Sequence, residues 1–92
     1  MKTFVYPAVL FEDKKTNSFV IAVYDLALYA EGNTVEEAHE QMKDMMGSFF
    51  SVALKNDLDF NPPTDFNKIM ADFPKNLCIL VEVNLDNKNN PM

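Results

Sequence analysis

Branched and aromatic side chains gather in four short stretches of this chain. Between the third and the fourth stretch, apolar residues recur at helical spacing. Branched and aromatic side chains favour strands, because they pack well on a pleated surface. The predicted strands span residues 4–11, 19–24, 28–31 and 77–85. The polar residues 12–18 separate the first two and predict a hairpin. Pro7 cannot donate to a strand ladder, so we expect it at an edge-facing position, at a bulge, or where its missing N–H does no harm.

Two helices are predicted between the third and fourth strands. Thr34 with Glu37 three positions later fits a capping box, so a long helix should run from Thr34 to near Asn56. Its apolar stripe consists of Val35, Ala38, Met42, Met45, Met46, Phe49, Val52 and Ala53. A short amphipathic helix follows over residues 65–73 and ends at Pro74.

The order of these elements predicts an α+β fold, a β-β-β-α-β two-layer sandwich with a short extra helix before the last strand. The long helix links an early strand to the last one as a crossover, so we expect one parallel strand pair among antiparallel ones. Residues 1–86 form a single domain, and residues 87–92 are a frayed polar tail.

The first two strands are apolar on both of their faces. A strand that is half exposed should alternate apolar and polar residues, and these two strands do not. One long helix covers one face, and the short helix covers part of the other. We expect a second copy of the chain or a different protein to cover the remainder. Coverage by the short helix and the chain ends, or simple exposure of some side chains, stays open as the alternative.

The charge balance narrows the class of partner. The chain has 14 acidic and 8 basic residues, a net charge of -6 and a pI of about 4.5. Binding to nucleic acid requires a basic surface, so DNA, RNA and anionic membranes are poor partners and a basic protein is a good one. The first ten residues lack a signal peptide, and no apolar run approaches the roughly 20 residues of a membrane span, so we expect a cytoplasmic protein.

Acidic residues at strand ends are the first candidates for catalysis. Glu12, Asp25, Glu31 and Glu82 could supply the carboxylates that hold divalent metals in a nuclease of RNase H type. They are spread along the chain, so solvated charges are the favoured interpretation. The single cysteine, Cys78, lies in an apolar run and is interpreted as a buried core thiol.

The long helix offers a second set of candidates. Glu36, His39 and Glu40 have the spacing of metal ligands on one helix face, but no second histidine or cysteine ligand lies nearby. We interpret His39 as a rim residue, and we assign the methionines of the helix to the core. We therefore predict a protein that is not an enzyme, with no catalytic residue, no metal site and no cofactor.

An ordered series of short motifs resembles the HicB family of antitoxins. The series is Tyr6-Pro7-Ala8-Val9-Leu10, the strand Phe19-Val20-Ile21-Ala22-Val23, the turn Asp25-Leu26 and the helix start Glu31-Gly32-Asn33-Thr34-Val35-Glu36-Glu37-Ala38. It covers roughly residues 4–55, with a compatible closing strand at 77–85. The family's turn carries a proline and a glycine, and the corresponding segment here, Tyr24-Asp25-Leu26-Ala27-Leu28-Tyr29, lacks them.

The resemblance implies a partial RNase H-like fold without RNase catalysis. It also implies that the chain neutralises a small, basic HicA-type toxin, an mRNA-cleaving protein of double-stranded-RNA-binding fold, by direct binding. Many family members carry a C-terminal DNA-binding segment, and this chain ends soon after its last strand, so no direct nucleic-acid binding is expected.

Acidic residues near the third strand and the helix start are our candidates for partner binding. They would steer and pair with basic groups of the toxin, and they are Glu31, Glu36, Glu37, Glu40 and Asp44. A homo-oligomer, a dimer or higher, is also expected. Two alternatives stay open: an orphan HicB-like domain that self-associates without a toxin, and a remnant of a metal-dependent nuclease.

Overall fold

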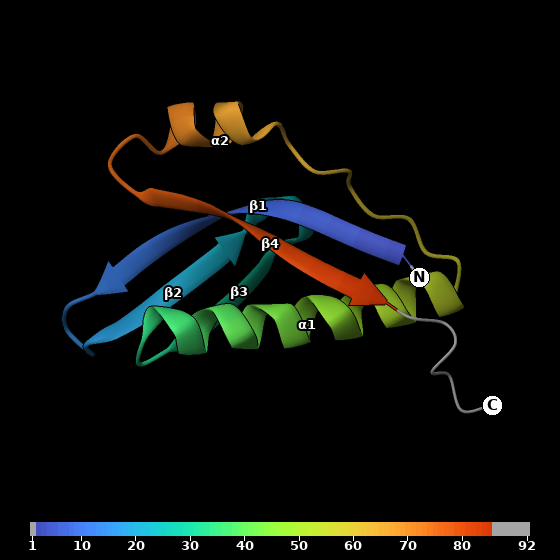
Figure 1. Ribbon diagram of the computed structural model, residues 1–92, viewed down its shortest axis with the longest axis horizontal. Helices are drawn as coiled ribbons and strands as arrows, with labels where there is room; N and C mark the ends of the chain where they lie inside the picture. Colours follow the sequence, from blue (N-terminus) through green and yellow to red (C-terminus); the bar gives the residue numbers. More distant parts are fainter. Residues whose placement is uncertain (1, 86–92) are drawn as a thin grey trace.

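The computed structural model describes residues 2–85, which form four strands, two α-helices and one short 3-10 helix. The elements in chain order are β1 (Lys2–Asp13), β2 (Ser18–Val23), η1 (Tyr24–Leu26), β3 (Leu28–Gly32), α1 (Val35–Lys55), α2 (Phe66–Asp72) and β4 (Leu77–Leu85). Each predicted element is present. The predicted tail, residues 87–92, lies outside the described residues. Figure 1 shows α1 and α2 on opposite sides of the sheet.

The four strands form one sheet in the order β3-β2-β1-β4, and every neighbouring pair is antiparallel. The prediction of one parallel strand pair is wrong. The chain does not pass from β3 to β4 through α1 alone, because residues 56–65 run back in an extended form before α2 (Figure 1). This additional passage brings β4 into the sheet from the opposite end.

The central strand β1 has different neighbours along its length. It pairs with β4 from Lys2↔Leu85 to Leu10↔Leu77, but it pairs with β2 only from Val9↔Ala22 to Asp13↔Ser18. Pro7 lies opposite Leu80 of β4, in the part of β1 that β2 does not reach. The edge-facing position expected for this proline is confirmed, because one side of β1 has no ladder there.

The hydrophobic core lies between the sheet and α1. The helix contributes a buried stripe made of Ala38, Met42, Met46, Phe50 and Ala53. Phe50, which the sequence pattern missed, is fully buried and stacks on Phe4 with ring centroids 3.9 Å apart. Val52 was predicted in the stripe and is 53% exposed, so this part of the prediction is wrong.

The start of α1 is fixed by the predicted capping box. The Thr34 hydroxyl accepts a hydrogen bond from the Glu37 N–H at 3.0 Å, and the Glu37 carboxylate accepts one from the Asn33 N–H at 2.7 Å. The return bond therefore reaches one residue before the usual N-cap amide. Together the two bonds satisfy free amides at the helix start, where Glu37 also favours the helix dipole.

Side chains of β1 and η1 hold the extended segment, residues 56–65, against the sheet. The Tyr6 hydroxyl donates to the Asn61 carbonyl at 2.5 Å, and the Asn61 side chain donates to the Asp25 carbonyl at 3.0 Å. The Asp25 carboxylate accepts from the Thr64 N–H at 2.8 Å and from the Thr64 hydroxyl. Burial raises the pKa of Tyr6 above its ordinary value, and the negative charge of Asp25 raises it further.

Candidate protein-binding surfaces

The second face of the sheet, opposite α1, is covered at its centre by the chain itself. Ile69 of α2 is 7% exposed and packs on this face, where Pro7, Val9 and Ala22 are buried. Phe73 stacks on Tyr24 with ring centroids 5.2 Å apart. The expectation that α2 covers part of this face is therefore confirmed for the central region.

Apolar side chains on either side of this central region remain exposed. Beside β4, Leu80 is 51% exposed, Val5 37% and Met70 of α2 41%. Beside β3, Tyr29 is 53% exposed and packs edge-on against Tyr24. The covering of these two strips by another protein stays a prediction, now confined to the flanks of the sheet.

The five acidic candidates divide into three groups in the structure. Glu36, Glu40 and Asp44 are exposed and follow one another at intervals of four residues, so they form one row on the side of α1 away from the core. We call these three residues the acidic row. Glu37 is used in the helix cap, and Glu31 of β3 accepts a hydrogen bond from the Ser18 hydroxyl at 2.7 Å. Of the five candidates, Glu36, Glu40 and Asp44 are the ones whose carboxylates have no such internal role among the bonds of residues 2–85.

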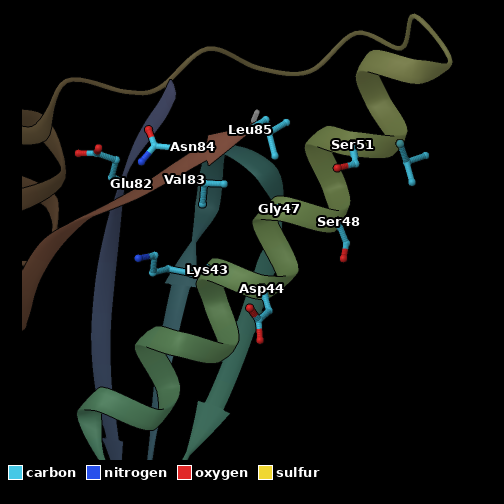
Figure 2. Close-up of a pocket in the computed structure, with 10 residues that line it drawn as sticks. Lys43, Asp44, Gly47, Ser48, Ser51, Glu82, Val83, Asn84 and Leu85 are labelled. Carbon is cyan, nitrogen blue, oxygen red and sulfur yellow. The ribbon is translucent and has the colours of Figure 1, made fainter. Parts of the chain in front are cut away.

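An open groove of about 800 Å³ runs between α1 and the outer edge of β4. Figure 2 shows Lys43 and Asp44 on the helix side and Glu82 and Asn84 on the strand side. Its lining is largely polar and carries charges of both signs. Sequence reasoning missed this groove. The available signal was the small residues Gly47, Ser48 and Ser51, which leave room between the helix and β4.

The carboxylates considered for a nuclease site are not gathered by the fold. Within residues 2–85, no three His, Cys, Asp or Glu side chains come together in a way that could hold a metal ion. Asp25 is bound to Thr64, and Glu31 to Ser18. Glu12 lies near the end of β1, and Glu82 is exposed on β4. The fold gives these four residues no common site.

The burial of two further predicted core residues, Met45 and Cys78, differs from the prediction. Met42 and Met46 are fully buried, as predicted, whereas Met45 is 36% exposed. Cys78 is half-buried on the second face of the sheet and not enclosed in the core. Between residues 2 and 85, neither α-helix combines the length and the apolar character that a membrane crossing requires.

Comparison with known proteins identifies the fold through structure alone. No family model matches the chain, and no curated protein matches it. The Burkholderia pseudomallei antitoxin HicB matches with a TM-score of 0.76 and 15% sequence identity over 90% of this chain. The chain spans 64% of the length of that antitoxin. The isolated N-terminal domain of the same antitoxin matches with a TM-score of 0.77, over 89% of this chain and 100% of the domain.

Two toxin-antitoxin complexes contain chains of the same fold. One is a complex from Streptococcus pneumoniae, with a TM-score of 0.78 and 16% identity over 99% of this chain and 78% of the matched chain. The other is the HicA3 and HicB3 complex, with a TM-score of 0.62 and 17% identity. This match covers 90% of this chain and 99% of the matched chain. The order of the strands and helices described above is thus the fold of the HicB antitoxin N-terminal domain.

Proposed function

We propose that this chain is an antitoxin-type domain that neutralises a small, basic HicA-type mRNA-cleaving toxin by binding it directly. The observation that carries the proposal is the fold shared with HicB antitoxin domains, including chains found in toxin-antitoxin complexes. The role of the domain is to occupy the toxin, and the chain's own residues perform no chemical step in it.

The charge of the chain supports a basic partner. The net charge is -6, and the acidic row presents three carboxylates on the open side of α1. Opposite charges speed the encounter of two proteins and disfavour wrong partners, more than they add to affinity. The complex should therefore form faster and hold better at low ionic strength.

The test is co-purification with the short basic protein encoded by a neighbouring gene. We expect a complex at low salt that weakens as salt is added, and we expect the chain to suppress RNA cleavage by that protein. Glu36→Gln with Glu40→Gln should slow association severalfold at low salt. The matched control, Glu12→Gln with Glu82→Gln, removes the same charge from other exposed carboxylates and should leave association close to that of the native chain.

Two results would contradict the proposal. One is the absence of any complex at low salt with the basic proteins of the neighbouring genes. The other is RNA cleavage by the chain alone with Mg²⁺ or Mn²⁺, which would favour the nuclease alternative.

The outer edge of β4 favours a second candidate function, self-association without a toxin. β4 has nine residues, contains no lysine, proline or bulge that would protect an edge, and exposes Leu77 and Leu80. Light scattering separates the two candidates. A stable homo-oligomer that binds none of the basic proteins encoded by neighbouring genes favours self-association.

A further inference from the structure

A second groove lies on the other flank of α1, and its lining differs from that of the groove beside β4. Its volume is about 380 Å³, and its lining residues are Met45, Ser48, Phe49, Val52, Ala53, Leu58 and Asp59. We call it the flank groove. Ser48 and Val52 line both grooves, so they form the ridge of α1 that separates the two. Five of the seven lining residues of the flank groove are apolar.

The groove is both apolar and accessible. Met45 is 36% exposed, Val52 53% and Leu58 54%. Several large apolar side chains exposed side by side, with polar groups around them, are typical of a binding surface. Scattered single exposures carry no such meaning, and the shared lining of one groove distinguishes this cluster from them.

The floor of the groove is fixed by the core. The Phe49 ring packs edge-on against Phe50 and Phe60, with centroids 5.2 Å and 6.0 Å apart. Phe50 is fully buried and also packs against Phe60 at 5.0 Å. An aromatic floor that is anchored in this way needs little reordering when a partner binds, which lowers the entropic cost of binding.

The spacing of the apolar residues fits a helix as the occupant. Met45, Phe49 and Val52 follow one another at i, i+4 and i+7 along α1. They extend over about 10 Å of the helix axis. A second helix lying along α1 can offer apolar side chains at the same spacing, as in helix-in-groove recognition.

The negative charge around the groove favours a basic partner over a second copy of the chain. Residues 36–59 contain six carboxylates and two lysines, so they hold a net charge of -4 of the chain's -6. Asp59 lines the groove, and Asp57 directly precedes the lining residue Leu58. A second copy would bring these carboxylates together, whereas lysine and arginine side chains beside an apolar helix face would pair with them.

We propose that the flank groove binds an amphipathic helix of the partner, with apolar residues in the groove and basic residues toward Asp57 and Asp59. This inference deepens the proposed function and rests on it for the basic character of the partner. It assigns the contact to the C-terminal half of α1 and residues 57–59, and it gives the exposed Met45, Val52 and Leu58 a role.

The test uses the full chain and a synthetic probe, an 18-residue amphipathic peptide of leucine and lysine with leucines at i, i+4 and i+7. Fluorescence anisotropy of the labelled peptide measures its Kd at low salt. We expect binding to the native chain that Val52→Lys and Leu58→Lys each weaken at least tenfold. Leu54→Lys is the matched control, because it adds the same charge at an exposed apolar side chain of the same helix, 37% exposed, that lines neither groove. This control should leave the Kd close to the native value.

Three outcomes would overturn the inference. The first is that Val52→Lys and Leu54→Lys weaken peptide binding equally, or that neither variant weakens it. The second is equally tight binding of a leucine and glutamate peptide with the same apolar pattern. The third is a homodimer in light scattering that Val52→Lys abolishes and Leu54→Lys preserves, which would make a second copy the occupant.

A further measurement separates this inference from the proposed function. If the neighbouring basic protein binds the Val52→Lys chain as tightly as the native chain, the assignment of the contact to the flank groove is wrong, and the proposed antitoxin function is retained. If the peptide binds in the groove and no neighbouring protein forms a complex, the antitoxin function fails and the groove remains a site for basic helices.

Discussion

Tyr6 joins the core to the extended segment through a single hydroxyl group. Its side chain is 1% exposed, its ring lies 5.6 Å from that of Phe50, and its hydroxyl donates to the Asn61 carbonyl. The neutral phenol is the form that this site accepts, since burial and the nearby Asp25 carboxylate both oppose ionisation and raise the pKa of Tyr6.

Replacement of Tyr6 by phenylalanine tests this hydrogen bond and its pH dependence. In the unfolded chain the phenol ionises near its ordinary pKa of 10. Above that pH the unfolded state loses its proton before the folded state does, so the free energy of unfolding falls as pH rises. We expect Tyr6→Phe to cost about 1 kcal/mol at pH 7. We also expect the variant to show a shallower loss of stability between about pH 9 and 11.

Urea unfolding across this pH range measures both effects. Tyr29→Phe is the control, because Tyr29 is 53% exposed and makes no such bond in the described residues. Identical pH slopes for native and Tyr6→Phe chains would contradict the role assigned to Tyr6.

The sequence predicted that α1 has a buried stripe, but it did not predict every residue of that stripe correctly. Phe49 and Phe50 are adjacent and differ by about 100° around the helix. Either residue continues a helical stripe that contains Met42, and in the structure Phe50 is the buried one. Phe50 stacks on Phe4 of β1, a contact between distant parts of the chain that helical spacing does not reveal.

Gly32 and Gly47 differ in the space that surrounds them. A Cβ placed on Gly32, at the end of β3, would lie 2.5 Å from the Ala38 backbone nitrogen, so the first turn of α1 packs directly on this residue. A Cβ on Gly47, within α1, would meet only the Val83 side chain at an ordinary 3.9 Å. Backbone therefore packs closely against Gly32 and not against Gly47.

Alanine substitutions should change stability in opposite directions at these two positions. Gly32→Ala should destabilise the fold by about 2 kcal/mol or more, because the obstacle is backbone that cannot move aside. Gly47→Ala should stabilise it by up to about 1 kcal/mol, through the higher helix propensity of alanine. Thermal unfolding of both variants measures the difference, and a loss of stability in Gly47→Ala would contradict the open environment assigned to Gly47.

The elements themselves follow closely from local patterns. β4 has the predicted bounds, and α1 and α2 end within one residue of the predicted ones. These elements carry strong local signals, such as the Thr34 cap and the Pro74 stop. β1 is longer at both ends than predicted, since Lys2 and Thr3 pair with Leu85 and Asn84 and are held there by β4, not by their own propensity.

Across the whole molecule, Asp25 and Thr64 fasten the extended segment that sets the topology. We expect Asp25→Ala to remove two acceptors from Thr64 and to cost about 1–3 kcal/mol. Thr64→Val keeps the backbone bond and should cost less. Hydrogen exchange checks the cause: the Thr64 amide should lose protection in Asp25→Ala while the amides of β2 and β3 keep theirs. Uniform loss of protection would contradict a local role for this contact.

The topology was the part of the fold that local patterns missed. Residues 56–65 look like a linker, with Pro62 and Pro63 the main signal. Ten extended residues reach about 33 Å, enough to cross the domain once more. The grooves on the two flanks of α1 depend on this passage and on the packing of β4, so no motif in the sequence predicted them. The acidic row, in contrast, lies within the acidic set chosen from the sequence, although Glu31 and Glu37 of that set make internal bonds.

The pairing of Lys2 with Leu85 sets a constraint on the order of synthesis. As the ribosome extends the chain, β1 can pair with β2 early, but the half of β1 before Val9 has no strand beside it until β4 emerges. Contacts of such long sequence separation slow folding, and they leave an open strand edge in the nascent chain. The sheet is therefore completed only after translation has passed Leu85, and any partner that recognises the finished domain must wait for that moment.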